Sequence, residues 1–181
     1  MKKIFNFPIV DNHIHINIEK GFGIEAVKLF ERYGGTHIFL VSLPSWCYNI
    51  HINHPNDFNL LFQKTLQTAS LISKKTNIKV FPILGIHPVE LLHLKKDLSI
   101  EEKIDIICKG LDIASKYVLE KKAFGLKSGR PHFFTEENIN KASNIILNYS
   151  LMKSKEINCP IQLHDKDMSF QNIYDLFKIA K

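Results

Sequence analysis

Short apolar runs alternate with longer amphipathic stretches along the whole chain. The runs are rich in Val, Ile and Phe and are nearly continuous, as strands covered on both faces should be. The longer stretches repeat apolar residues at spacings of three and four, which is the period of a helix with one buried face. This alternation predicts repeated strand–helix units and a parallel sheet.

Five such units can be placed on the sequence. The predicted strands are Ile9 to His13, His37 to Ser42, Lys79 to Ile86, Ala123 to Lys127 and Ile161 to His164. The predicted helices are Gly23 to Tyr33, Pro55 to Thr76, Ile100 to Leu119, Glu136 to Glu156 and Ser169 to Ala180. The third helix has a clear start, because Ser99 and Glu102 have the spacing of a capping box.

Two architectures fit this alternation: an open doubly wound sheet, or part of an eight-stranded β/α barrel. A nucleotide-binding open sheet should carry a glycine-rich loop after its first strand, but Asp11-Asn12-His13-Ile14-His15 stands there. Catalytic groups of barrels gather at the C-terminal ends of several strands, which suits polar residues at this position. We therefore predict a TIM-type β/α barrel, incomplete, with about five of eight units.

Composition and charge narrow the class of protein. The chain has 181 residues, of which 45% are hydrophobic and 23% charged, so a single globular domain over residues 1–181 is expected. The net charge of +6 comes from scattered lysines, which favours a solvated basic surface over a dedicated nucleic-acid face. Three cysteines without C-x-x-C spacing predict neither a disulfide framework nor a cysteine zinc site. A cytoplasmic location is expected, and no membrane partner, since no apolar run approaches transmembrane length.

His13 and His15 are the first candidates for metal ligands. They stand two residues apart at the end of the first strand, so both rings point to the same side in extended backbone. Two imidazoles placed in this way can share one zinc, iron, manganese or nickel ion. The alternative is a pair of ordinary strand-end histidines bonded to backbone or solvent.

The fifth and third strands end in further histidines. Gln162 and His164 share one face of the fifth strand, and burying both would be costly unless that face looks into a polar or metal-bearing interior. His87 begins the loop after the third strand, where Pro88 fixes the turn. His87 could line a substrate pocket, orient the metal site or cap the strand.

The loop after the fourth strand brings a positive charge to the same end of the sheet. Arg130 and His132 lie close together in Gly129-Arg130-Pro131-His132-Phe133. Arg130 would suit an anionic group of a substrate, or it could pair with Glu136 or Glu137. Trp46, after the second strand, is either a pocket wall or packing under a loop.

Taken together, these motifs resemble the TatD-related branch of the amidohydrolase-like metal-dependent hydrolases. The resemblance rests on Asp11-Asn12-His13-Ile14-His15, Gly85-Ile86-His87-Pro88, Ala123-Phe124-Gly125 leading to Gly129-Arg130-Pro131-His132, and Gln162-Leu163-His164. It implies a β/α barrel with one or two divalent ions, whose identity among Zn, Mn, Fe, Ni and Mg stays open. TatD members are nucleases, and broader relatives hydrolyse amides, esters or phosphotriesters.

The resemblance also implies residue roles. His13 and His15 would be metal ligands of the first strand and His164 the ligand of the fifth, while His87, Arg130 and His132 would bind the substrate. A metal-activated water would attack a phosphodiester in DNA or a small amide or ester. The family also expects a histidine on a sixth strand and a catalytic aspartate on an eighth. Because the sequence reaches only a fifth unit, we expect a truncated chain that is inactive alone.

Lys127 marks a second departure from the family pattern, because many TatD proteins carry a glutamate ligand on this strand. An ungapped match puts that glutamate at Leu126. However, Lys127 lies on the same face of the strand as the small residues Ala123 and Gly125, and this favours a Lys127 side chain that points into the barrel. A carboxylated Lys127 could then replace the carboxylate as a ligand bridging two ions, as in the wider superfamily. The alternative is a lysine that bonds a loop carbonyl or the substrate.

Two classes of function remain open from sequence. The first is the metal-dependent hydrolase, acting on a small molecule or on nucleic acid. The second is a degenerate, non-catalytic half-barrel that serves as a binding or interaction module, for which the incomplete ligand set is the best support. The sequence fixes neither the substrate nor the oligomeric state.

Overall fold

The computed structural model describes residues 7–165 and 169–180, and in these ranges five strands form one parallel sheet. The strands stand side by side in sequence order, from β1 to β5. Doubly wound topology would insert the first strand among the others, so the prediction of an incomplete β/α barrel is confirmed. The strands are β1 (Val10–Ile14), β2 (His37–Val41), β3 (Lys79–Gly85), β4 (Gly125–Gly129) and β5 (Ile161–His164).

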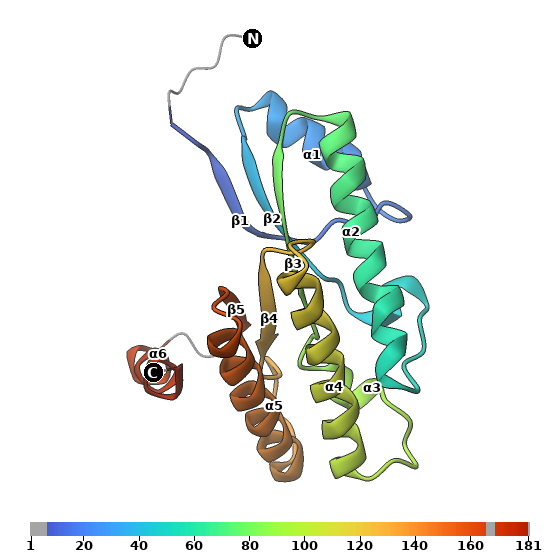
Figure 1. Cartoon of the computed structure of the whole chain (residues 1–181), viewed down its shortest axis with the longest axis vertical. Helices are drawn as coiled ribbons and strands as arrows, with labels where there is room; N and C mark the ends of the chain where they lie inside the picture. The colour runs from blue at the N-terminus through green and yellow to red at the C-terminus, as the bar shows by residue number, and fades with distance from the viewer. Residues whose placement is uncertain (1–6, 166–168, 181) are drawn as a thin grey trace.

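A long helix follows each strand. These helices are α1 (Gly23–Arg32), α2 (Phe58–Lys75), α4 (Ile100–Leu119), α5 (Glu137–Glu156) and α6 (Phe170–Ala180). Helices α2, α4 and α5 cover the outer face of the sheet, whereas α6 stands apart from it (Figure 1). The capping box predicted for α4 is present, since Ser99 Oγ accepts from the Glu102 N–H and the Glu102 carboxylate accepts from the Ser99 N–H. Two shorter elements were not predicted, the 3-10 helix Ser45–Tyr48 and the one-turn α3 (Glu90–His93). The helix predicted from Pro55 begins with a 3-10 turn, Pro55–Asp57, that leads directly into α2.

The main core lies between the sheet and helices α2, α4 and α5. Leu84 and Leu126 of the sheet pack there with Phe58, Phe62 and Leu111 of the helices. These side chains are fully buried, and each such burial stabilises the fold by about 1.5–3 kcal/mol. The apolar side of each strand is therefore held against helices, which leaves alternate residues to face the inside of the half-barrel.

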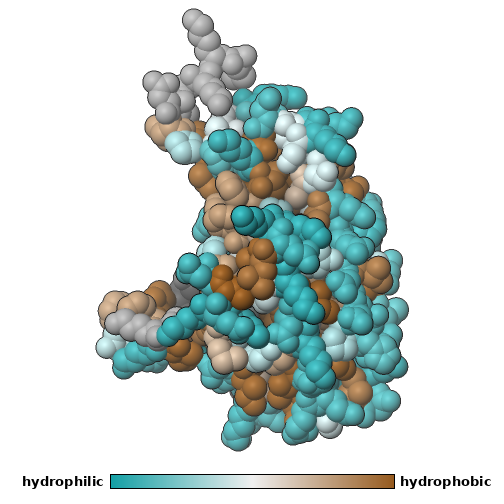
Figure 2. Space-filling view, in the orientation of Figure 1, coloured by the Kyte–Doolittle hydropathy of each residue, from teal (hydrophilic) through white to brown (hydrophobic). Residues whose placement is uncertain are grey.

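The inner face of the half-barrel is concave. Phe39, Phe81 and Phe124 form a ring cluster on it, with centroids 5.1 to 5.5 Å apart. A cavity of about 470 Å³ opens above this cluster and reaches from Asn12 of β1 to Gln162 of β5. The outline of the molecule is hollowed on the left of Figure 2, between its upper end and α6. This hollow gives the carboxyl ends of β1 and β5 a shared space.

Strand β4 begins and ends two residues later than predicted. Ser128 and Gly129 pair with Leu163 and His164 of β5, so the strand continues past its apolar run. The shift places Lys127 inside β4 rather than at its end. Within the described residues, no helix is both long and apolar enough to cross a membrane.

Candidate metal centre

A β-bulge at the end of β1 determines the positions of the first pair of histidines, His13 and His15. The pairing with β2 runs from Asp11 opposite Ile38 to Ile14 opposite Leu40, so β1 carries one extra residue in this segment. Bulges bend a strand and re-aim side chains, and they are common next to active sites. The extended backbone assumed from sequence is thus interrupted, yet His13 and His15 still turn toward each other.

The separation of these two rings fits a shared ion. His13 Nε2 lies 3.3 Å from His15 Nε2. Two imidazole nitrogens bound at 2.0–2.1 Å to one tetrahedral zinc would lie about 3.3–3.4 Å apart. His15 Nδ1 lies 2.9 Å from the carbonyl oxygen of Val41, a bond that needs the hydrogen on Nδ1 and leaves the lone pair on Nε2. The geometry of the pair therefore suits a transition metal.

Gln162 joins β5 to this pair across the concave face. Its Nε2 donates to the backbone carbonyl of Asn12 at 2.7 Å. Partial burial and the charge of Lys127 lower the pKa of the neighbouring His13 ring, and Gln162 acts in the opposite direction. Gln162 thus holds the end of β1 from the opposite strand.

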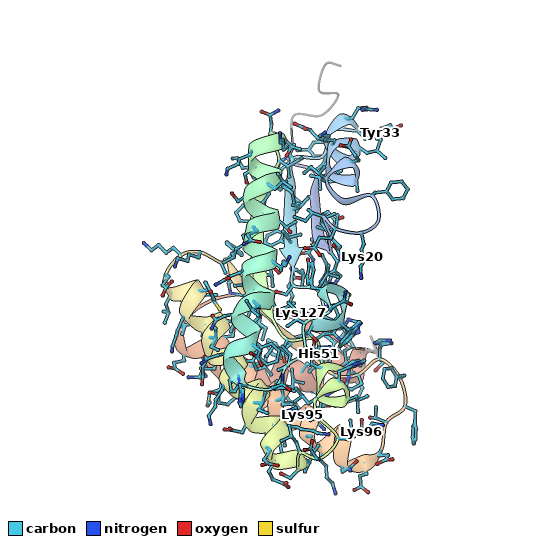
Figure 3. All side chains as sticks on the ribbon, turned by 90° about the vertical axis from the view of Figure 1, so that its right-hand side faces the viewer. Lys20, Tyr33, His51, Lys95, Lys96 and Lys127 are labelled. Atoms are coloured by element: carbon cyan, nitrogen blue, oxygen red, sulfur yellow. The ribbon has the colours of Figure 1, made fainter. Side chains whose placement is uncertain are left out.

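Lys127 lies buried among the imidazoles, as the parity argument predicted. Its side chain is fully buried, and Nζ donates to the backbone carbonyl of Ser42 at 3.4 Å. Leu126 packs on the opposite side, in the core beneath the helices. Figure 3 shows Lys127 near the middle of the molecule, whereas Lys95 and Lys96 lie lower in that view.

Burial also changes the charge state of Lys127. It lowers the pKa of the ammonium group to about 8, while Glu90 and Cys47 act in the opposite direction. Burial and, second to it, the charge on Lys127 lower the pKa of His15 to about 4 and that of His87 to about 3. The imidazoles are therefore neutral near pH 7, which is the form that binds metals.

Glu90 is a buried carboxylate that the sequence reasoning missed. It is fully buried at the start of α3 and accepts hydrogen bonds from the Ser45 N–H at 2.6 Å and the Ser45 hydroxyl at 2.9 Å. These bonds tie the loop after β2 to the loop after β3. Its position three residues after His87 was the available signal, since acidic groups beside a strand-end histidine often belong to a site.

His87, His132 and His164 form a second group of imidazoles. His164 Nε2 lies 3.2 Å from His132 Nδ1, and the ring of His87 lies 4.9 Å from that of His164 between centroids. Among residues 7–165 and 169–180, this is the one group of three or more His, Cys, Asp or Glu whose ligand atoms all lie within 4.8 Å of one another. The structure thus brings His164 to His132 and His87 rather than into such a group with His13 and His15.

The guanidinium group of Arg130 is hydrogen-bonded to neighbouring side chains. Its Nη1 bonds Asp165 Oδ2 at 3.1 Å and Asn172 Oδ1 at 3.0 Å, and its Nε donates to Asn144 at 2.8 Å. The ion-pair partner is therefore Asp165, not the Glu136 or Glu137 considered from sequence. The guanidinium joins the loops after β4 and β5 to α5 and α6.

Trp46 packs beside the second group of histidines. Its ring stacks on His93 with centroids 4.0 Å apart, and it meets the ring of His87 edge-on at 6.0 Å. A cavity of about 300 Å³ lies next to it and is lined in part by Ser45, Asn49 and His51. Trp46 is thus both a pocket wall and a packing group.

Comparison with known proteins gives the family. The model of the family described as TatD related DNase matches residues 10–181, which is nearly the whole chain. The chain belongs to the TatD-related DNase family. All of the histidines discussed above lie within the TatD-related match.

Two other proteins resemble this TatD-related chain. An uncharacterized protein of Methanocaldococcus jannaschii is 33% identical over 184 residues, which cover 100% of this chain and 63% of that protein. A crystal structure of a TatD-like protein from Archaeoglobus fulgidus aligns with a TM-score of 0.49 and 16% identity, over 94% of this chain and 73% of that one. The chain thus spans less than two thirds of the curated relative that it matches.

Proposed function

We propose that this chain carries the metal site of a divalent-metal-dependent hydrolase. The substrate would be a phosphodiester in DNA or a small amide or ester. The observation that carries the proposal is the 3.3 Å separation of His13 Nε2 and His15 Nε2. Membership of the TatD-related family supports it, because the name of that family describes a DNase.

The residues of the chain prepare the site for the ion. Val41 accepts the Nδ1 hydrogen of His15, so Nε2 is free to coordinate. Gln162 holds the backbone of Asn12, next to His13, from β5, and Lys127 would supply an oxygen ligand once carboxylated. A bound divalent ion would activate water as the nucleophile and polarise the bond to be cleaved. Arg130 is predicted to contact the substrate only if its bonds to Asp165 and Asn172 rearrange.

Hydrolysis by the purified protein tests the proposal. We expect cleavage of DNA or of a small ester or amide in the presence of Zn²⁺ or Mn²⁺, and its loss with a chelator. The His13→Ala/His15→Ala variant should lose at least about 100-fold in rate, because removing even an outer partner of a ligand costs 10–100-fold. His54→Ala is the control and should keep full activity, because His54 is exposed just before the 3-10 turn Pro55–Asp57.

Two outcomes would contradict the proposal. A protein that retains its ion but cleaves none of these substrates would instead fit a non-catalytic binding module. Equal rates for the wild type and the His13→Ala/His15→Ala variant would show that these two residues do not hold the reactive ion.

A further inference from the structure

We propose that Trp46 is the stacking face of a subsite for a planar heteroaromatic ring of the substrate. The subsite is the cavity of about 300 Å³ lined in part by Ser45, Trp46, Asn49 and His51. The ring is either a nucleobase or the aromatic group of a small ester or amide. The inference rests on the proposed function for the reaction, and it adds the group that the protein recognises beside the bond to be cleaved.

The size and lining of this cavity suit one planar ring. Its volume is about 300 Å³, which is at the lower end of the range of about 300–1,000 Å³ for small-molecule sites. Ile50 and Ile52 supply an apolar wall, and the half-buried ring of Trp46 supplies a flat one. Stacking on an aromatic side chain accepts any ring with a π face. The cavity therefore selects for planarity.

The contact between Trp46 and His93 shows that a planar ring fits against the indole. The two rings are stacked, with centroids 4.0 Å apart and planes 23° from parallel. His93 also lines the cavity and is exposed at the end of α3. Its imidazole can therefore swing away and leave this face of the indole to a ring of the substrate.

A buried carboxylate holds Trp46 in position. Glu90 is fully buried and accepts hydrogen bonds from the Ser45 N–H at 2.6 Å and the Ser45 hydroxyl at 2.9 Å. Ser45 is the first residue of the 3-10 helix that carries Trp46. Hydrogen bonds to a carboxylate are about twice as strong as neutral ones. Because the backbone of Trp46 is fixed in advance, stacking costs little conformational freedom.

Asn49 and His51 place polar groups around the cavity. Both residues are exposed, and neither side chain is hydrogen-bonded to another residue within the described ranges. The amide of Asn49 can donate and accept at once, as an asparagine does when it binds the edge of adenine. Binding of this kind would favour a nucleobase over a simple aromatic group.

The cavity adjoins the histidines at the strand ends. The ring of Trp46 lies 6.0 Å from that of His87, which lies 4.9 Å from that of His164, between centroids. A substrate whose ring stacks on Trp46 would thus hold its neighbouring bond beside these histidines. Trp46 would then be a residue that determines specificity.

Fluorescence tests the inference directly, because Trp46 is the single tryptophan of the chain. Metal-free protein is titrated with deoxyadenosine monophosphate, with benzamide, and with deoxyribose phosphate, which lacks the ring. We expect saturable quenching by a ring-bearing probe and none by the sugar phosphate. Tighter binding of the nucleotide, weakened in Asn49→Ala, would identify a nucleobase subsite. Tighter binding of benzamide would identify a subsite for a simple aromatic group.

Calorimetry of variants measures the part played by the indole. Trp46→Ala should weaken the better ring-bearing probe about 5- to 150-fold, which corresponds to about 1–3 kcal/mol for stacking. Trp46→Phe should retain most of the affinity. His93→Ala should bind at least as tightly as the wild type, because the imidazole no longer competes for the indole. His54→Ala is the control and should bind as the wild type does.

Three results would overturn the subsite: no saturable quenching by either ring-bearing probe, equal quenching by the sugar phosphate, or equal affinities of the wild type and Trp46→Ala. Weaker binding by His93→Ala would overturn the displacement of its imidazole. Saturable binding without hydrolysis would sink the proposed function and leave the subsite intact, whereas hydrolysis without quenching would overturn the subsite alone. Circular dichroism checks folding, and the wild-type titration with Trp46→Phe decides the matter if Trp46→Ala unfolds.

Discussion

The positive charge of Lys127 acts on imidazoles in both groups of histidines. Lys127 is fully buried. Burial of the rings and, second to it, the Lys127 ammonium group lower the pKa of His13, His15, His87 and His164. An unmodified ammonium at this position would repel a divalent ion. Its own pKa of about 8, lowered by burial, leaves roughly a tenth of the amine neutral at pH 7. A neutral amine can react with carbon dioxide.

We therefore predict that Lys127 becomes carboxylated when metal binds. The amine nitrogen bonds the carbon of CO₂ and releases a proton, and the carbamate formed is an anionic oxygen ligand. Protein loaded with Zn²⁺ and ¹³C-bicarbonate should show a carbamate signal by NMR. The signal should disappear in Lys127→Gln and persist in the surface variant Lys95→Gln. Zinc affinity that does not respond to bicarbonate, with no labelled signal, would contradict the prediction.

The depressed pKa values of His15 and His87 predict acid sensitivity of the metal-free fold. Below pH 6.5 the unfolded chain binds protons on these rings, whereas the folded chain does so only near pH 4 and pH 3. Their contribution to stability is therefore complete above pH 6.5 and is lost as the pH falls. Urea unfolding should show a loss on the order of 1–2 kcal/mol from pH 6.5 to 5, after allowance for solvent screening. His87→Gln should reduce this slope, and a pH-independent stability would refute the argument.

At the scale of elements, the pattern of apolar residues was sufficient to predict the order and type of the main strands and helices. It did not reveal the extension of β4 through Ser128 and Gly129, because that extension depends on pairing with β5. The 3-10 turn Ser45–Tyr48 was missed because it is too short to show a period.

The candidate site was predictable in part. Strand-end position indicated His13, His15, His87 and His164, and parity indicated Lys127. Sequence spacing could not show that His164 lies with His132, because the loop after β4 brings His132 back over β5. Glu90 was missed because its bonds to Ser45 join two loops 45 residues apart.

Gly129 allows β4 to approach the backbone of β5 beside the site. It has φ +151°, and a Cβ there would lie 1.9 Å from the carbonyl oxygen of His164. Gly129→Ala should therefore lower the free energy of unfolding by about 2–4 kcal/mol and displace His164. The control is Gly21→Ala, because Gly21 also has positive φ but nothing within 4 Å of a Cβ. Chemical denaturation measures both, and equal costs would show that the approach of β4 to β5 does not matter.

At the scale of the whole molecule, the two groups of histidines lie at one end of a concave sheet. The residues facing its interior include the cluster of Phe39, Phe81 and Phe124, and α6 leaves Phe170 and Phe177 largely exposed. The relative from Methanocaldococcus jannaschii is longer than this chain, which covers 63% of it. The histidines of both groups lie on this chain, so metal binding can be measured on it directly.

The metal content of the purified protein tests the central claim most directly. Elemental analysis of the wild type and of His13→Ala/His15→Ala, purified side by side, compares the ions retained per chain. If His13 and His15 hold an ion through Nε2, as their 3.3 Å separation indicates, the variant should lose one transition-metal ion per chain. An unchanged metal content in the folded variant would contradict the account.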